Sequence, residues 1–560
     1  AFFIPNTITP MPDIYIPMGK LNGAKDKDKV IVQLTKWEKS TRKPEGEVIK
    51  IFTPEQENDL AMQAIVAEAG FALNFSEEVN QFAKNLSEKI EANEIAKRKD
   101  YRNILTFTID PVDAKDFDDA ISFRNLPNGN TEIGVHIADV SHFVQPNTAI
   151  DKEAYERATS VYLPDRVYPM LPERISNELC SLRPNEDKLT FSACFEIDAK
   201  GKIVNTWYGK TIIHSVRRFT YEQVQEIIET QKGDHSNEIL WLLHFTQNVR
   251  KARFDNGAIN FSSQEVRFVL DANGKPTGIT IKESKESHQL IEELMLLANQ
   301  LIAQKMGQVK IKKETLPFPY RVHDQPNEEK LAPFIVFAKK HGYAFDISTP
   351  LQTAHSFNDL MKAAQQSPER HVLEQLGIRT MAKAVYTSDN IGHYGLGFEY
   401  YCHFTSPIRR YPDILVHRIV QSVLLEKPIN DSELEQKCVH CSERERAAME
   451  AERAANKYKQ VEFMQNYIGQ SFEGIISGVS SFGFWVETLE HKCEGLVSIV
   501  SLSEFDDFRL VESDYALVGM RSGRRFSMGE KVTIKVIAAN LEKRQLDYQW
   551  EIPKKPKSTT

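Results

Sequence analysis

Five aspartates stand within ten residues of the chain, at positions 110, 113, 116, 118 and 119. The residues just before them, 104–109, are apolar, β-branched or aromatic, which predicts a buried strand. Because proline cannot donate to a sheet ladder, Asp110-Pro111 should end that strand. Carboxylates crowded at a strand end repel one another and raise one another's pKa values. A divalent cation would relieve the repulsion, and oxygen ligands suit Mg²⁺ or Mn²⁺ rather than zinc.

Two other interpretations of this acidic segment are possible. An acidic run is most often a solvated surface loop, but the apolar segments on both sides of this one argue against free movement. A calcium loop of the EF-hand kind would need D-x-D-x-D-G spacing and a preceding helix, and the sequence has neither. The residues therefore favour a site for a hard cation.

The segment at 108–120, T-I-D-P-V-D-A-K-D-F-D-D-A, resembles the signature of the RNB exoribonucleases, the ribonuclease II/R family. In that family four aspartates hold Mg²⁺ at the scissile phosphate. The resemblance places this role, by motif position, on Asp110, Asp116, Asp118 and Asp119. Asp118 is the residue whose substitution should reduce catalysis most. Asp113 falls outside the set and is expected to be a surface acid.

A second segment, H-F-T-S-P-I-R-R-Y-P-D at 403–413, matches another signature of the same family. Arginine suits phosphate oxygens because its donors form a fixed fork and it is always charged. The resemblance implies that Arg409 binds phosphate and catalyses with Asp118, and that Arg410 is a supporting contact. The R-R-Y-P-D form is closer to the ribonuclease R branch than to the ribonuclease II branch.

Three further RNA contacts follow from the resemblance. The tyrosine of Y-L-P, Tyr162, and the phenylalanine of G-A-I-N-F, Phe261, would clamp the terminal base from opposite sides. Stacking on aromatic rings tolerates any base. A glutamate on the amphipathic segment 290–299 would lie near the 3′-terminal nucleotides, and Glu292 matches better than Glu293. The plainer interpretations are a core tyrosine, a buried strand phenylalanine and an exposed helix acid.

The length of 560 residues predicts three or four domains. We expect a multidomain α+β protein in which a mixed α/β RNB catalytic core is flanked by small OB-fold β-barrels. The expected units are a cold-shock-type OB domain at 1–53, a helical linker at 54–100, the RNB catalytic domain at 101–430, a connecting helix at 431–466, an S1-type OB domain at 467–549 and a basic tail at 550–560.

Residues 467–549 resemble the S1-type RNA-binding domain. In that likeness Phe482 and Trp485 stack bases, and Arg544 occupies the usual basic position. Two positions depart from the pattern, where Ser498 stands in place of a histidine and Asn540 in place of an aspartate.

Charge is distributed unevenly along the chain. The net charge of −8 alone argues against a polyanionic partner. Residues 20–50, however, carry nine Lys or Arg against five acids, and residues 521–560 carry ten against four. Basic ends around an acidic middle suit the phosphate backbone of a nucleic acid.

The cysteines and the chain ends say where the protein should act. The six scattered cysteines make no disulfide framework, which fits a reducing cytoplasm, and the single C-x-x-C at 438–441 is expected to be incidental on a helix. No apolar run is long enough to span a membrane, and the N-terminus is not a signal peptide. The chain does not begin with Met, and family members carry another OB domain upstream, so we expect an N-terminal part to be missing.

The resemblance implies a processive, Mg²⁺-dependent 3′→5′ exoribonuclease of the exoribonuclease II type, with Mn²⁺ as an alternative ion. It would bind the 3′ ends of single-stranded RNA as a monomer, degrade structured RNA as well, and release 5′-nucleoside monophosphates by a two-Mg²⁺ mechanism. Two alternatives are a non-catalytic RNA-binding protein and a metal-dependent DNA nuclease. The intact aspartates and Arg409 count against the first. Only contacts to the ribose 2′-OH would separate the second.

Overall fold

The N-terminal unit is a small sheet. The computed structural model describes residues 1–5, 11–37, 44–52, 57–261, 265–311, 313–365, 367 and 370–552. Four strands pair in the order β1-β2-β4-β3 and enclose a small apolar core that includes Ile14 and Val48. The strands are β1 (Phe2–Phe3), β2 (Ile14–Tyr15), β3 (Val30–Lys36) and β4 (Glu45–Ile51). The β-structure expected for residues 1–53 is therefore present among the described residues.

The following segment is helical, as its composition predicts. Ser76 begins the second of its helices by accepting a hydrogen bond from the Val79 N–H, which satisfies one of the free donors at a helix start. The helices are α1 (Glu57–Glu68), α2 (Glu77–Lys84) and α3 (Ala92–Ile95).

A seven-stranded sheet forms the centre of the molecule, in the order β13-β6-β7-β8-β11-β12-β5. β6 pairs in parallel with β13 and β12 in parallel with β5, while the other neighbours are antiparallel. The strands are β5 (Lys99–Asp100), β6 (Thr106–Asp110), β7 (Asp119–Asn125), β8 (Thr131–Ala138), β11 (Asp187–Ile197), β12 (Ile203–His214) and β13 (Arg217–Thr220).

The strand predicted before the aspartates is β6. All five of its residues are buried, and it ends at Asp110, immediately before Pro111. A turn at Asn128-Gly129 joins β7 to β8, and Gly129 takes the positive φ of 84° that such a turn requires. The sheet therefore brings the two ends of the acidic loop together at the tips of neighbouring strands.

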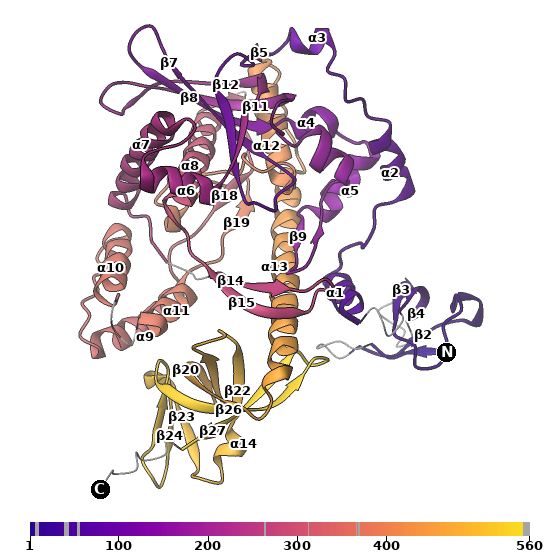
Figure 1. Cartoon of the computed structure of the whole chain (residues 1–560), viewed down its shortest axis with the longest axis vertical. Coiled ribbons are helices and arrows are strands. Elements are labelled where there is room, and N and C mark those ends of the chain that lie inside the picture. Colours follow the sequence, from indigo (N-terminus) through magenta and orange to yellow (C-terminus); the bar gives the residue numbers. More distant parts are fainter. Residues whose placement is uncertain are drawn as a thin grey trace.

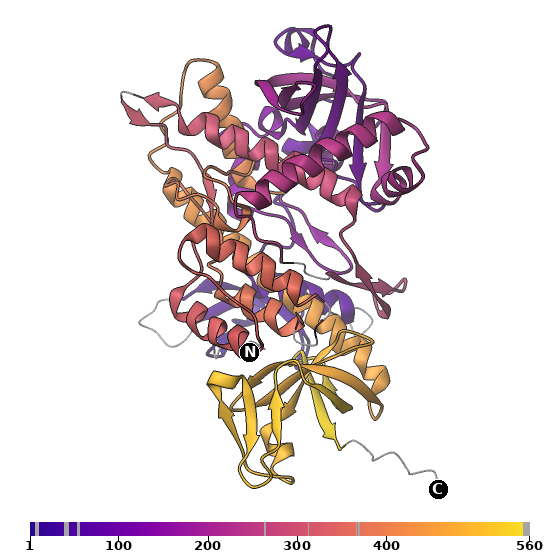
Figure 2. The same ribbon diagram turned by 90° about the vertical axis from the view of Figure 1, so that its left-hand side faces the viewer.

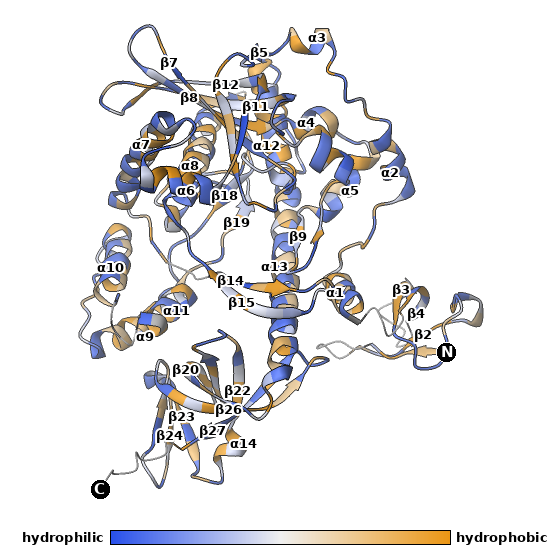
Figure 3. Ribbon diagram, in the orientation of Figure 1, coloured by the Kyte–Doolittle hydropathy of each residue, from blue (hydrophilic) through white to orange (hydrophobic). Residues whose placement is uncertain are grey.

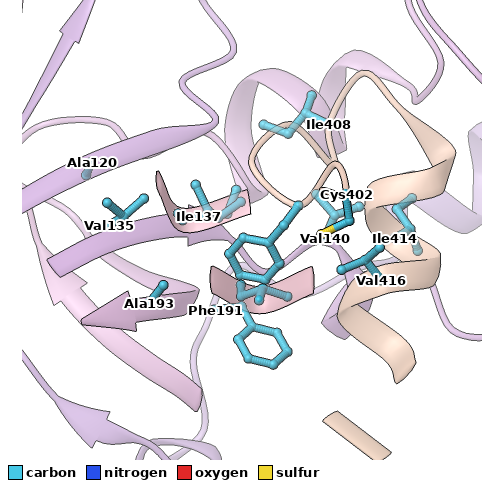
Figure 4. Packing of buried hydrophobic residues seen from close by; sticks show 14 of the residues in the cluster. Ala120, Val135, Ile137, Val140, Phe191, Ala193, Cys402, Ile408, Ile414 and Val416 are labelled. Atoms are coloured by element: carbon cyan, nitrogen blue, oxygen red, sulfur yellow. The ribbon is translucent and has the colours of Figure 1, made fainter. Parts of the chain in front are cut away.

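Helices pack on this sheet and complete the largest apolar core. Figure 4 shows Ile408, Ile414 and Val416 lying against residues of the sheet, including Ile137 and Phe191. The helices α6 and α8 show hydrophobic and hydrophilic residues side by side, as expected for helices with one buried face (Figure 3). The helices are α4 (Val140–Phe143), α5 (Ala149–Arg157), α6 (Tyr221–Thr230), α7 (Ser236–Asp255), α8 (Glu286–Gly307) and α12 (Tyr411–Leu424).

Short hairpins extend from this body. Three of them are β9 (Val161–Tyr162) with β10 (Val167–Tyr168), β14 (Glu265–Leu270) with β15 (Pro276–Lys282), and β16 (Lys310–Ile311) with β17 (Glu314–Thr315).

A separate helical unit has its own apolar core. Its two connections to the body are the paired strands β18 (Tyr320–Val322) and β19 (Val385–Thr387). The unit lies between the body and the C-terminal domain (Figures 1 and 2). Its helices are α9 (Glu328–Lys340), α10 (Pro350–Ala363) and α11 (Arg370–Thr380).

The predicted connecting helix is α13 (Leu434–Met464), which runs from the body to the C-terminal domain in Figure 1. That domain contains a closed barrel in the order β20-β21-β22-β27-β26 and a three-stranded sheet, β23-β24-β25. Its elements are β20 (Ser471–Ser480), β21 (Gly483–Thr488), β22 (Glu494–Ser498), α14 (Ile499–Leu502), β23 (Phe508–Val511), β24 (Ala516–Gly519), β25 (Arg525–Ser527), β26 (Lys531–Asn540) and β27 (Gln545–Glu551).

Both cysteines of the C-x-x-C segment are buried along α13, as the incidental interpretation predicts. Among the described residues, no helix combines the length and the apolar character that crossing a membrane requires.

Candidate active site

The acidic loop connects β6 to β7 and is held in place by Arg218 and Ser181. The Arg218 guanidinium, on the neighbouring strand β13, donates to the carbonyl oxygens of Pro111 (2.6 Å) and Val112 (2.9 Å). Ser181 accepts from the Phe117 N–H at 3.0 Å and donates to the Lys115 carbonyl at 2.8 Å. This loop is therefore anchored rather than solvated, which excludes the plain surface-loop interpretation.

Asp118 is buried at the end of this loop. Its side chain accepts a hydrogen bond of 3.0 Å from the Ile408 N–H, and its carbonyl accepts one of 2.8 Å from Ala138. The Arg409 Nε lies 3.9 Å from the Asp118 Oδ2. Burial raises the pKa of Asp118 well above its usual range, and Arg409 only partly opposes this. The two sequence signatures, about 290 residues apart, thus meet at Asp118 and Ile408.

The pKa values of the other three aspartates are raised as well. Burial raises the pKa of Asp110 to about 6 and that of Asp119 to about 8. Repulsion adds to both, since Asp116 acts on Asp110 and Asp110 acts on Asp119. Burial also raises the pKa of Asp116. Asp113 is exposed, as predicted. The four residues therefore form one acidic cluster, in which Arg409 and Arg218 only partly offset the effect of burial on the pKa values.

The donor chemistry of this cluster fits a hard divalent cation. Asp110 Oδ2 is buried and has no hydrogen-bond partner within the part of the chain that the structure describes. In that same part, no three His, Cys, Asp or Glu side chains are arranged to hold a metal ion by themselves. Mg²⁺ rarely uses a cage made wholly of protein, and instead combines one or two carboxylates with water and substrate phosphate. The residues present thus fit a metal site that the substrate completes.

Arg409 and Arg410 face different surroundings. The Arg409 side chain is 43% exposed and donates to the Ser406 Oγ at 3.1 Å. Arg410 is largely buried and donates to the Asp413 Oδ1 at 2.8 Å. Asp413 also accepts the Ser406 N–H at 2.7 Å. The structure therefore brings Arg409 to the acid cluster and gives Arg410 a buried partner in the first turn of α12.

Tyr162 borders the cluster from the β9 hairpin. Its neighbours Val161 and Leu163 point into the core, while 38% of Tyr162 stays exposed. Burial raises the pKa of Tyr162, and Arg409, Asp116 and Asp118 all lie close enough to affect it. Its backbone N–H donates to the Glu452 carboxylate at 3.0 Å. An accessible ring beside the acids is suited to stacking on a base.

Phe261 lies with the helical unit. Its ring packs edge-on to Phe357, with 5.7 Å between ring centroids. It lines a cavity of about 1780 Å³ between this unit and α13, whose wall also includes Arg446, Met449 and Arg453. None of the four clustered aspartates is among the described residues of that wall. The structure thus places Tyr162 at the cluster, whereas Phe261 lines a cavity whose described wall does not include the four aspartates.

The structure distinguishes the two glutamates of α8. Glu293 is 1% exposed and pairs with Arg250 at 2.9 Å and with the buried Arg253. Glu292 is an exposed residue. Partial loss of water around its carboxyl group raises its pKa, and the charge of Glu293 raises it further. Glu292 is therefore the one that a ligand can reach.

The three predicted RNA contacts of the C-terminal domain differ in their exposure and in their partners. Phe482 is 72% exposed and Trp485 is partly buried. The Arg544 guanidinium donates to Glu68 of α1 at 2.8 Å. Arg544 therefore joins the barrel to the helical linker in this structure.

Sequence reasoning missed two residues at the cluster. Tyr221 begins α6, stacks on His288 with 4.2 Å between centroids, and lies close enough to Asp119 and Asp110 for their charges to raise its pKa further after burial. Glu452, on α13, accepts the Tyr162 N–H. Tyr221 follows β13, and only the pairing of β13 with β6 could have revealed it. His136, in contrast, is buried and its ring nitrogens make hydrogen bonds with the Ser192 and Ser122 hydroxyls.

Comparison with known proteins gives matches along nearly the whole chain. The RNB domain model matches residues 98–426, and the cold shock domain model matches residues 2–76. The chain is 39% identical to ribonuclease R 1 of Lactococcus lactis over 90% of this chain and 62% of that one, and 35% identical to ribonuclease R of Thermotoga maritima over 98% and 78%. The chain thus spans less than two thirds of the length of the Lactococcus relative.

A solved structure is similar as well. Mycoplasma genitalium RNase R in complex with ribose methylated single-stranded RNA superposes with a TM-score of 0.87. The two chains are 26% identical, and the match covers 97% of this chain and 85% of that one. The mixed α/β architecture with an OB-like unit and a small barrel, expected from the sequence, is confirmed by these likenesses.

Proposed function

Since this chain belongs to the RNB domain family, we propose that it is a hydrolytic 3′→5′ exoribonuclease acting on single-stranded RNA. The observation that carries the proposal is the group of four buried or half-buried aspartates whose raised pKa values are only partly offset by nearby arginines, beside the exposed Arg409 and Tyr162. Such a group is unstable alone and suits a ligand that brings cations and phosphate together.

Different residues of the chain would bind different parts of the RNA. Tyr162 would stack on the 3′-terminal base, because its ring is accessible beside the cluster. Arg409 would hold the scissile phosphate through its fork of donors, 3.9 Å from Asp118. Glu292, the reachable glutamate of α8, would contact the terminal nucleotides. Arg410 would act through Asp413 by fixing the loop that presents Arg409.

Asp110, Asp116, Asp118 and Asp119 would hold two Mg²⁺ ions, or Mn²⁺ in their place. When bound, these ions would lower the pKa of water and stabilise negative charge on the phosphate. Asp110 Oδ2 remains buried without a partner among the described residues, which supports its role as a ligand. Ile408 would keep one Asp118 oxygen in position through its N–H.

The route to the site would use the flanking domains. The cavity beside α13 carries Phe261 and the cations Arg446 and Arg453, which suits the bases and backbone of a single strand. Phe482 on the exposed face of the barrel would add a stacking platform, with Trp485 behind it. Processive removal of 5′-nucleoside monophosphates by a monomer completes the proposal.

One assay tests the proposal. The protein is incubated with a 3′-tailed RNA, its DNA copy and a 3′-recessed RNA duplex, each in Mg²⁺ or in EDTA. We expect Mg²⁺-dependent shortening of the RNA from its 3′ end. The matched variants are Asp118→Asn, inside the cluster, and Asp113→Asn, an exposed acid of the same loop.

Each outcome has a clear meaning. Loss of activity in Asp118→Asn but not in Asp113→Asn supports the site. Turnover in EDTA, or equal turnover by both variants, contradicts it. Binding of RNA without cleavage would instead identify a non-catalytic RNA-binding protein, and equal digestion of the DNA copy a general nuclease. Digestion of the duplex would extend the substrate to structured RNA.

A further inference from the structure

A fully buried lysine joins segments far apart in the sequence. Lys459 lies in α13, and its side chain has no exposed surface. Its Nζ donates to the Asn58 Oδ1 of α1, to the Gly274 carbonyl in the turn between β14 and β15, and to the Glu462 carboxylate at 2.8 Å. A buried Nζ normally satisfies all of its donors, and this one meets three acceptors on three elements.

The amide of Asn58 extends this junction to the hairpin that carries Tyr162. While its oxygen accepts from Lys459, its Nδ2 donates to the Asp165 Oδ2 at 2.9 Å. Asp165 lies in the turn between β9 and β10, closed by the hydrogen bond from the Leu163 N–H to the Arg166 carbonyl. Tyr162 is the last residue of β9, three positions before Asp165.

The second hairpin fits into the same junction. Gly274 has a φ of 75°, and an added Cβ would lie 2.5 Å from the Asn58 Nδ2 and 3.3 Å from the Asp165 Oδ2. Only a glycine therefore lets this turn approach Asn58 closely. The β14–β15 turn and the β9–β10 turn therefore meet at Asn58.

Apolar packing reinforces the junction. Val161 and Leu163, on either side of Tyr162, belong to one buried cluster with Met62 of α1 and Tyr458 of α13. A salt bridge between Arg166 and Asp59 adds a second tie between the β9 turn and α1. Figure 1 shows α1 beside α13 and the β14–β15 hairpin. The position of Tyr162 thus depends on α1, the helix that leads from the N-terminal sheet.

We propose that Lys459, Asn58 and Asp165 are positioning residues that set the Tyr162 hairpin for stacking on the terminal base. The inference rests on the proposed function for the role of Tyr162, but the arrangement of the hairpin can be tested without RNA. The strength of base stacking should then depend on a contact made on α1, outside the acid cluster.

The test uses Asn58→Asp in the full chain. An aspartate can still accept from Lys459 but cannot donate to Asp165, and its charge repels that carboxylate, so one link breaks while the buried lysine keeps its acceptor. Asn248→Asp, on the exposed surface of α7, makes the same chemical change elsewhere. Hydrogen exchange of residues 161–168 is measured without RNA. Fluorescence of a 3′-terminal 2-aminopurine is measured with saturating RNA, and both variants also carry Asp118→Asn to prevent cleavage.

We expect Asn58→Asp to increase exchange in residues 161–168 at least several-fold and to reduce quenching of the bound 2-aminopurine, with Asn248→Asp unchanged in both. A merely structural role would lower the amount of folded protein but leave the quenching of bound RNA unchanged. Unchanged exchange, or faster exchange with unchanged quenching, would overturn the proposal. Failure of the parent chain to shorten RNA, in the assay above, would instead count against the proposed function.

If Asn58→Asp does not fold, Gly274→Ala gives a second test from the other hairpin. Its Cβ would displace Asn58 from Asp165 without altering any charge. The same increase in exchange at 161–168 is expected, and unchanged exchange overturns the proposal.

Discussion

Two buried aspartates at one edge of the central sheet differ in their electrostatic surroundings. Asp118 and Asp139 are close neighbours, since the Ala138 N–H bonds to the Asp118 carbonyl. Asp139 meets Arg98 at 2.7 Å, Lys210 at 2.9 Å and the Ser141 hydroxyl at 2.7 Å, and these partners hold its pKa below the usual range despite burial. Asp118 accepts the Ile408 N–H, its ion pair among the described residues is with Arg409 at 3.9 Å, and its pKa is raised by burial.

The difference separates structural from functional burial. Both carboxylates lose contact with water, and only one regains that free energy from the protein's own charges. Burial also raises the pKa values of Asp110, Asp116 and Asp119. The incomplete compensation of buried charge is therefore a property of the site and not of Asp118 alone. Burial alone does not mark an active site, whereas burial without counter-charge does.

Asp118→Asn should have the largest effect on activity. We expect RNA hydrolysis to fall roughly 10³-fold or more, since the change removes a ligand of ions that stabilise charge in the transition state, and a tenfold loss corresponds to about 1.4 kcal/mol. The thermal midpoint in EDTA should stay the same or rise, because an uncompensated buried charge is gone. Asp113→Asn is the control. A fall in stability equal to that of a core ion-pair variant would contradict the comparison.

Asp139→Asn should do the opposite. Breaking a buried ion pair costs about 3–5 kcal/mol, because Lys210 loses its carboxylate partner and Arg98 keeps only Glu94. The thermal midpoint should therefore fall, and the kcat of the molecules that remain folded should stay near that of the parent chain. Denaturation and active-site-normalised kinetics measure the two effects. A selective loss of kcat with an unchanged midpoint would place Asp139 in the active site and break the distinction.

The two regions should also respond to pH with opposite signs. The pKa values of Asp110 and Asp119 rise from 3.8 to about 6 and about 8, so the folded state binds more protons than the unfolded chain. Their contribution to stability in EDTA therefore falls as pH rises from about 4 to about 8. The pKa of Asp139 is lowered, so its contribution is present above about 4 and is lost as pH falls below that value.

Thermal midpoints across pH 4–9, in EDTA and in Mg²⁺, measure this response. Mg²⁺ should flatten the loss of stability at high pH, because the ions bind the ionised carboxylates. Asp119→Asn should reduce the slope in EDTA, and Asp113→Asn should not. A midpoint that rises steadily with pH in EDTA and is insensitive to Asp119 would contradict the assignment.

Local sequence patterns predicted the secondary-structure elements but not the contacts between distant segments. The strand ending at Asp110, the Asn128-Gly129 hairpin and the long α13 follow from local periodicity and turn chemistry, so the sequence revealed them. The meeting of Asp118 with Ile408, and of Tyr221 with Asp119, depends on strand pairing and packing between distant segments. Nothing in the sequence near Asp139 indicated that Arg98 and Lys210 would neutralise it. The partners of Arg410 and Arg544 were missed for the same reason.

Tyr162→Ala tests the residue that borders the acid cluster. Stacking on an aromatic ring contributes about 1–3 kcal/mol per base, so KM for a short RNA should rise roughly 5- to 100-fold, while the acid cluster keeps its pKa shifts. Tyr162→Phe retains the ring and should behave nearly as the parent chain. Steady-state kinetics with short oligonucleotides measure the effect. An equal loss in both variants would assign the effect to the hydroxyl group rather than to stacking.

The pair between Arg544 and Glu68 should show the smallest effect, because it is paired like Asp139 but partly exposed. Such pairs contribute at most about 1 kcal/mol to stability, so Arg544→Ala and Glu68→Ala should each shift the thermal midpoint slightly. Their RNA affinities separate two roles. If Arg544 also contacts phosphate, its loss should weaken binding and reduce the salt dependence by about one ion, while Glu68→Ala, which frees the guanidinium, should strengthen binding. Equal affinities in both variants would make Arg544 a structural link between the barrel and α1. Its role would then resemble that of the paired Asp139, which follows β8.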